Sequence, residues 1–108
     1  MTDRELLELA ARAIGLGPVL CYESARNCLR IGNRENYSLW RPLSDDSDAL
    51  RLAATLQLDV IWFANMQYVT VERRGFGENV GWVDDAGRAG ALRRAITVVA
   101  AQIGRTMP

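Results

Sequence analysis

Three aspartates, Asp45, Asp46 and Asp48, stand in four consecutive positions directly ahead of an apolar run. Carboxylates this close together could hold a divalent cation or support acid–base catalysis. A calcium loop of the EF-hand type also needs a central glycine and a closing glutamate, where this chain has Leu50 and Leu56. All three aspartates instead suit the first turn of a helix, where acidic groups face the positive end of the helix dipole. The sequence therefore predicts a helix start here and no metal or catalytic cluster.

A second stretch that could do chemistry begins at Arg73 and reads Arg-Arg-Gly-Phe-Gly-Glu-Asn-Val-Gly. The dinucleotide-binding fingerprint needs its third glycine one position earlier, in a loop that leads from a strand into a helix. A loop between two strands is therefore the preferred interpretation of residues 75–81. Two arginines beside flexible backbone leave an alternative, which is a site for an anion or small ligand. That site would consist of Arg73, Arg74, Gly75 and Gly77.

Aromatic residues and arginines supply most of the binding energy in protein interfaces, so the exposed ones are candidate anchors. Trp62 lies inside a strand-like run, which is typical of a core position. Trp40 precedes a proline in an irregular segment and is the best exposed candidate, although packing under the following helix is favoured. The candidate partner-binding residues are Trp40, Arg41, Arg73, Arg74, Phe76 and Arg88.

The charge balance and residue types exclude several function classes. The chain has 13 basic and 13 acidic residues, every basic residue is arginine, and histidine is absent. Nucleic-acid-binding domains usually carry a positive excess, so that role is disfavoured. Arginine without lysine fits either genome bias or bidentate anion recognition, and composition does not separate the two. Without histidine the chain lacks the commonest general base and metal ligand. We therefore expect no enzyme activity, no metal and no cofactor.

The compartment can be inferred from the apolar runs and the cysteines. No apolar stretch approaches the roughly 20 residues that cross a bilayer, and the chain starts with charged residues instead of a signal peptide. We therefore expect a cytoplasmic protein that does not contact membranes. Cys21 and Cys28 lie in one predicted hairpin, and we expect two buried free thiols. A four-residue loop over 23–26 would place them opposite each other, so their pairing stays open.

Three amphipathic segments read as helices. The first covers about residues 3–14 behind a capping box, and the second ends near Gln57. The third follows Asp84 or Asp85 and has apolar residues that step by four, three and four positions. The predicted cap residues are Thr2, Glu5, Ser44, Asp45, Asp46 and Asp84.

Two pairs of β-prone segments read as hairpins. Residues 19–23 and 27–31 flank one turn, and residues 59–63 and 67–72 flank another. Residues 32–38 are polar and are predicted to form a loop, while residues near 80–83 could add a short fifth strand. The order is therefore α-β-β-α-β-β-α in a single domain over 1–108. It indicates an α+β layered sandwich of a small antiparallel sheet with three helices.

The run from Trp40 to Ala53, Trp-x-Pro-Leu-x-Asp-Asp-x-Asp-Ala-Leu-x-Leu-Ala, resembles small uncharacterised proteins of proteobacterial tailed phages and prophages. Residues 5–11 and 94–104 are similar to theirs as well, whereas residues 59–83 match least. More remotely, the layout is similar to the phage α/β/α "ABA sandwich" domains. The resemblance implies a phage origin and a layered fold, and it carries over no catalytic residue.

Three function classes follow from these observations. The first is a small non-enzymatic phage or prophage accessory protein that binds a host or phage protein, for host takeover or as a stoichiometric inhibitor in counter-defence. The second is a small-ligand or nucleotide-binding protein, a sponge or sensor, that uses the Arg/Gly loop. The third is a nucleic-acid-binding protein or a metal-assisted enzyme. A homodimer through the alanine-rich last helix or an exposed strand edge is also open.

Overall fold

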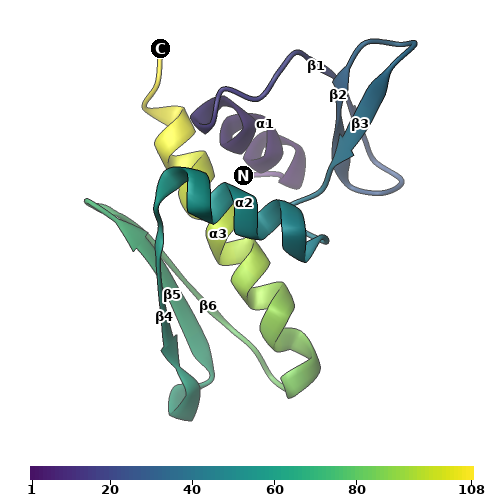
Figure 1. Ribbon diagram of the computed structural model, residues 1–108. Coiled ribbons are helices and arrows are strands. Elements are labelled where there is room, and N and C mark those ends of the chain that lie inside the picture. The colour runs from purple at the N-terminus through teal and green to yellow at the C-terminus, as the bar shows by residue number, and fades with distance from the viewer.

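The computed structural model describes residues 1–108 and shows three helices and two separate sheets (Figure 1). The helices are α1 (Asp3–Ala13), α2 (Asp46–Leu56) and α3 (Arg88–Arg105). The first sheet contains β1 (Val19–Glu23), β2 (Cys28–Gly32) and β3 (Tyr37–Trp40). The second contains β4 (Asp59–Phe63), β5 (Tyr68–Arg73) and β6 (Phe76–Gly81). Two short 3₁₀ helices, η1 (Ala64–Met66) and η2 (Asp85–Gly87), connect β4 to β5 and precede α3.

The predicted α+β class and three helices are confirmed, but each predicted hairpin is joined by a third strand. Part of the predicted 32–38 loop belongs to β3, which pairs antiparallel with β2 and places Trp40 opposite the buried Leu29. The predicted loop over 75–81 is also wrong, because β6 occupies most of it. Only Arg74 and Gly75 form the turn, both with positive φ, as a tight two-residue hairpin connection requires.

The helix starts follow the capping rules. The Thr2 hydroxyl accepts from the Glu5 amide at 3.2 Å, and Asp45 accepts from the Asp48 amide at 2.9 Å. Ser44 makes no such bond, and Asp46 is already the first residue of α2, so neither is the cap. Asp84 caps η2 through the Gly87 amide, so α3 itself begins without a side-chain cap.

Helix α3 is the central element of the core. Helices α1 and α2 both pack against it, and it also covers β5 and β6 of the second sheet (Figure 1). Val69 and Val71 alternate along β5 and are fully buried on the face toward α3. Where α3 meets α1, Gly104 lies so close to the Leu9 carbonyl that a methyl group there would overlap it. None of the three helices combines the length and apolarity that a bilayer crossing requires.

The two cysteines occupy different environments on the first sheet. Cys28 is buried, and burial raises the pKa of its thiol. Cys21 is exposed, which contradicts the prediction that both thiols are buried. The loop between β1 and β2 spans 24–27, so Cys21 lies opposite Arg30 while Cys28 lies opposite Glu23. Both thiols are free.

Candidate functional site

Strand β4 stands out because every one of its residues is exposed, although four of the five are apolar. Val60, Ile61, Trp62 and Phe63 keep between 37% and 45% of their surface accessible. The cause is the position of β4 at the edge of its sheet, where β5 is the element that packs along it. Helix α3 covers β5 and β6 and leaves β4 beyond its reach. An apolar edge strand without a cover is a candidate interaction surface.

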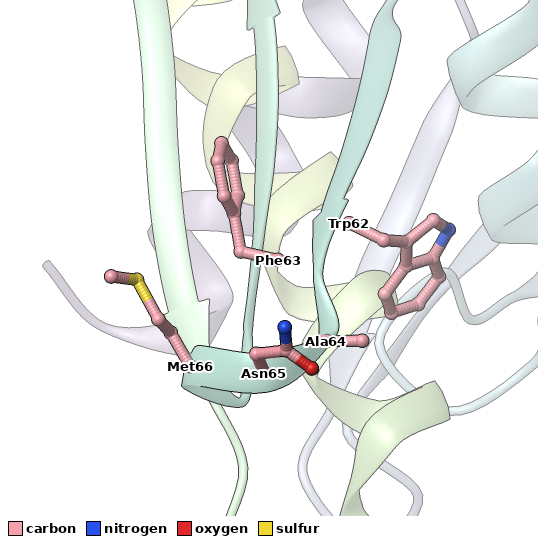
Figure 2. A pocket seen from close by; sticks show the side chains of 5 residues that line it. All are labelled: Trp62, Phe63, Ala64, Asn65 and Met66. Carbon is pink, nitrogen blue, oxygen red and sulfur yellow. The ribbon is translucent and has the colours of Figure 1, made fainter.

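The pairing register assigns the side chains of β4 to two faces. Trp62 lies opposite the buried Val69, so its side chain is on the face toward α3. Ile61 and Phe63 are one position out of phase and therefore lie on the outer face, where Phe63 is opposite Tyr68. Figure 2 shows the side chains of Trp62 and Phe63 on opposite sides of the strand. No helix covers the outer face.

Aromatic and thioether groups gather where β4 turns into β5. The Phe63 and Tyr68 rings stack with centroids 4.6 Å apart and planes at 13°. Met66, in η1, is 69% exposed. A shallow hollow of about 390 Å³ lies at this tip and is lined by Trp62, Phe63, Ala64, Asn65 and Met66 (Figure 2). We call the outer group Ile61, Phe63, Met66 and Tyr68 the hairpin surface.

Behind the hairpin surface, a pair of tryptophans joins the tip to the helical core. The Trp62 ring meets the edge of the Trp82 ring at a centroid distance of 5.7 Å. Trp82 is buried, and the Arg88 guanidinium lies 5.5 Å from its ring centroid. The prediction that Trp62 is a core residue is wrong, since 45% of it is exposed. The tip is therefore held rigidly while its outer side remains accessible.

Most of the predicted partner-binding residues have structural partners. Trp40 is buried, so its indole is not an exposed anchor. The Arg41 amide donates to Asp48 at 2.8 Å, and its side-chain Nε is buried without a hydrogen bond. Arg88 pairs with Asp85 at 2.6 Å, and Phe76 packs against the core. None of these four contributes to the hairpin surface.

The predicted Arg/Gly site does form an open depression, of about 440 Å³, at the opposite end of the second sheet. Arg73 already donates to the Leu56 carbonyl at 2.7 Å, at the C-terminal end of α2, where Gln57 ends the helix in a left-handed conformation. The backbone N–H and C=O of Gly77 both bond the side chain of Gln102. The lining residues are Asp59, Glu72, Arg73, Arg74, Gly75, Phe76 and Gly77. Two carboxylates offset the two guanidiniums, so the surroundings do not favour an anion, and the ligand site stays a prediction.

The acidic triplet is occupied by structural contacts. Asp45 caps α2, and Asp46 pairs with Arg93 at 2.6 Å. The Asp48 amide donates to the Asp45 carboxylate, and the Asp48 carboxylate accepts from the Arg41 amide, which ties the Pro42 segment to the helix. No group of three or more His, Cys, Asp or Glu side chains is arranged to hold a metal ion. The helix-start interpretation of the triplet is confirmed.

The outer face of the first sheet is charged. Glu23 bonds Arg26 at 2.6 Å and Arg30 at 3.1 Å, and these hydrogen bonds hold the pKa of its carboxyl below the usual value. The Arg30 guanidinium also lies 4.9 Å from the centroid of the Tyr37 ring. We call these four side chains the charged cluster.

Comparison with known proteins found no matching family model, curated protein or solved structure. The function is therefore inferred from the residues of this chain. Sequence reasoning missed the hairpin surface because a short apolar run such as 59–63 is typical of a strand buried on both faces. The available signal was the position of this run in a hairpin, which allows it to be an edge strand.

Proposed function

We propose that this chain is a non-enzymatic binding protein that docks against another protein through the hairpin surface. The observation that carries the proposal is the exposure of Ile61 and Phe63 on one uncovered sheet face, with Met66 exposed beside them in η1. Large apolar side chains gain free energy when they leave water, at roughly 25 cal/mol per Å². A partner that covers this face would supply that gain.

The hairpin surface also has the composition of an interface centre. Aromatic residues and methionine are enriched there, while charged residues are depleted. The Phe63–Tyr68 stack fixes both rings before binding, which lowers the entropy lost on association. Val69 and Val71 anchor the same hairpin in the core on its other face. The surface is therefore a preorganised apolar platform, suited to an apolar ridge on a partner.

The identity of the partner is proposed from the resemblance to phage and prophage proteins. A host or phage protein would be its target, and stoichiometric occlusion of a host complex, as in counter-defence, would need no reactive residue. Such a mode of action requires only a complementary surface and a sufficient copy number in the host cytoplasm.

The test compares three tagged forms of the chain in lysate of a proteobacterial host. The wild type and a Tyr37→Ser control, changed at an equally exposed aromatic of the first sheet, should retain the same stoichiometric protein. The Phe63→Ser/Met66→Ser variant should lose it by 30-fold or more, since hot-spot truncations cost about 2 kcal/mol or more. The retained protein is then purified, and its affinity for all three forms is measured by calorimetry.

Two outcomes would contradict the proposal. One is equal binding of the retained protein by all three forms, which would place the interface elsewhere. The other is the absence of any stoichiometric partner for the wild type. Circular dichroism of the double variant must match the wild type, because both changed side chains are already exposed and contribute little to the core.

A further inference from the structure

We infer that two copies of this chain pair edge to edge along β4, in antiparallel orientation, and form a continuous six-stranded sheet. The inference rests on the backbone edge of β4, which Ile61 and Phe63 of the hairpin surface border, and it is tested separately from the proposed function. An edge strand presents unpaired N–H and C=O groups that can accept a further strand.

The four sheet edges differ in how they are protected. Strand β1 has a register shift between Val19 and Cys21, and bulges of this kind discourage pairing. Strand β3 has only four residues. The outward groups of β6 are blocked at Gly77, where the Gln102 amide both donates and accepts. Strand β4 has five residues, no bulge, no proline and no lysine. It is the unprotected edge of the molecule.

The outward backbone groups of β4 can be assigned from the hairpin register. The residues that flank a two-residue turn, here Arg73 and Phe76, exchange both ladder hydrogen bonds. Hydrogen-bonded and non-bonded pairs then alternate along β5, so odd positions of β5 bond β6 and even positions bond β4. The bond from the Trp82 amide to the Gln67 carbonyl agrees with this phase. On β4, Ile61 therefore bonds Thr70, while Val60 and Trp62 turn their N–H and C=O groups to the free edge.

The outward N–H and C=O groups of one copy can pair with the same groups of a second copy. In an antiparallel pair centred on Ile61, Val60 of one copy faces Trp62 of the other, and both residues have outward groups. All four outward N–H and C=O groups of each copy are then used. Side chains agree with the same register, because Val60 and Trp62 share one face and form β-branched–aromatic pairs, which stabilise antiparallel sheets.

Charge and closure also favour a second copy. The chain has a net charge of zero, so two copies meet no overall repulsion. The only charged residue of β4, Asp59, lies opposite Phe63 of the second copy and at the far end from its own equivalent. The pair uses β4 of both copies and leaves no open β4 edge, so the assembly stops at a dimer. The twofold axis is perpendicular to the sheet, so both hairpin surfaces lie on the same face.

The size of this interface sets the expected affinity. Val60, Ile61, Trp62 and Phe63 keep between 37% and 45% of their surface accessible, so two copies bury at most about 650 Å² through these residues, the size of a weak, transient interface. We therefore expect a weak dimer, with a dissociation constant of about 0.1–1 mM.

The test is sedimentation equilibrium of the purified full chain from about 1 µM to 1 mM, a range that includes this constant. The mass should rise from 12.0 kDa toward twice that value. Val60→Pro removes an outward N–H without breaking an internal bond and should weaken the dimer at least 10-fold. Val60→Thr keeps the N–H and the branched side chain, and should stay within about threefold of the wild type.

A second readout needs no variant. Hydrogen exchange followed by NMR should show the Val60 and Trp62 amides becoming protected as concentration rises, while the Ile61 amide is protected throughout. A chain that remains monomeric at about 1 mM would overturn the inference. So would a dimer in which Val60 and Trp62 exchange as fast as in the monomer, or one that Val60→Pro and Val60→Thr affect equally. A monomeric chain that still retains a stoichiometric partner would refute the dimer alone and leave the proposed function standing.

Discussion

The two sheets of this molecule have the same size and the same antiparallel order, yet their outer faces differ. Toward the core they are alike, because Leu29 in the first sheet and Val69 and Val71 in the second are fully buried. Outward, the first sheet has the charged cluster and the second has the hairpin surface. The sheets also pack differently on the helices, because α3 covers β5 and β6 whereas the first sheet meets α1 through β2. The difference shows that an apolar outer face is not common to the two sheets, and it singles out the hairpin surface as the face on which the proposed function rests.

The largest effect on stability is expected at Gly104, which sets the distance between α1 and α3. Gly104→Ala places a methyl group on the Leu9 carbonyl and should cost about 3 kcal/mol or more. Urea denaturation measures this cost. Hydrogen exchange should show that α1 and the adjacent β2 lose more protection than β5, because α1 contacts the first sheet through β2.

Gly90 is the matched control on the same helix. A methyl group there would meet only the end of the Arg93 side chain at 3.6 Å, so Gly90→Ala should be neutral or stabilising by up to about 1 kcal/mol. Equal losses at positions 90 and 104 would show that α1 is not closely packed on α3.

A smaller difference in the free energy of unfolding is expected between a substitution in a buried strand and one in the exposed strand. Leu29→Ala in β2 removes a fully buried side chain and should lower the free energy of unfolding by about 3 kcal/mol. Ile61→Ala in β4 should cost about 1 kcal/mol or less, because 38% of Ile61 is exposed. Thermal and urea unfolding of both variants measures the two losses and therefore their ratio. Similar losses would mean that β4 is covered in the isolated chain.

The sequence predicted those parts of the fold that depend on neighbouring residues. The first helix was expected over 3–14 and spans Asp3–Ala13, because the Thr2 cap and the apolar spacing are local signals. Both hairpins were likewise found. Strand β3 was missed, and β6 was expected only as a possible short strand near 80–83, because polar residues and glycines interrupt both and only pairing with β2 and β5 makes them strands.

The candidate site depends on contacts between residues far apart in the sequence, which local sequence patterns do not reveal. Whether Trp62 is buried or exposed is decided by how far α3 extends over the sheet, and α3 begins 26 positions later. Trp40 was expected to pack, with an exposed anchor as the alternative, and β3 carries it into the core opposite Leu29. Trp40 thus has the buried position that was favoured for it, whereas Trp62 departs from its expected core position because of long-range packing.

The smallest effect concerns the charged cluster of the first sheet. Hydrogen bonds from Arg26 and then Arg30 lower the pKa of Glu23, so the folded state keeps its carboxylate at lower pH than the unfolded chain does. The resulting stabilisation is complete above the ordinary value of 4.5 and is lost as the pH falls through the lowered pKa. Glu23→Gln should therefore flatten the pH dependence of the unfolding free energy below pH 4.5.

Arg26→Gln removes the main hydrogen-bond donor to Glu23 and should reproduce most of that flattening. Denaturation curves collected at closely spaced pH values compare the two variants with the wild type. An acid dependence that neither variant alters would assign the effect to other carboxylates. The expected change is slight, because solvent screens exposed ion pairs.

Site-specific photo-crosslinking tests the contrast between the two sheets most directly. A photoreactive phenylalanine analogue replaces either Phe63 or Tyr37, whose exposures of 38% and 41% are nearly equal, and the protein is irradiated inside proteobacterial cells. We predict a discrete adduct with another protein from position 63 and none from position 37. Adducts from position 37 alone, or the same adducts from both positions, would contradict the account.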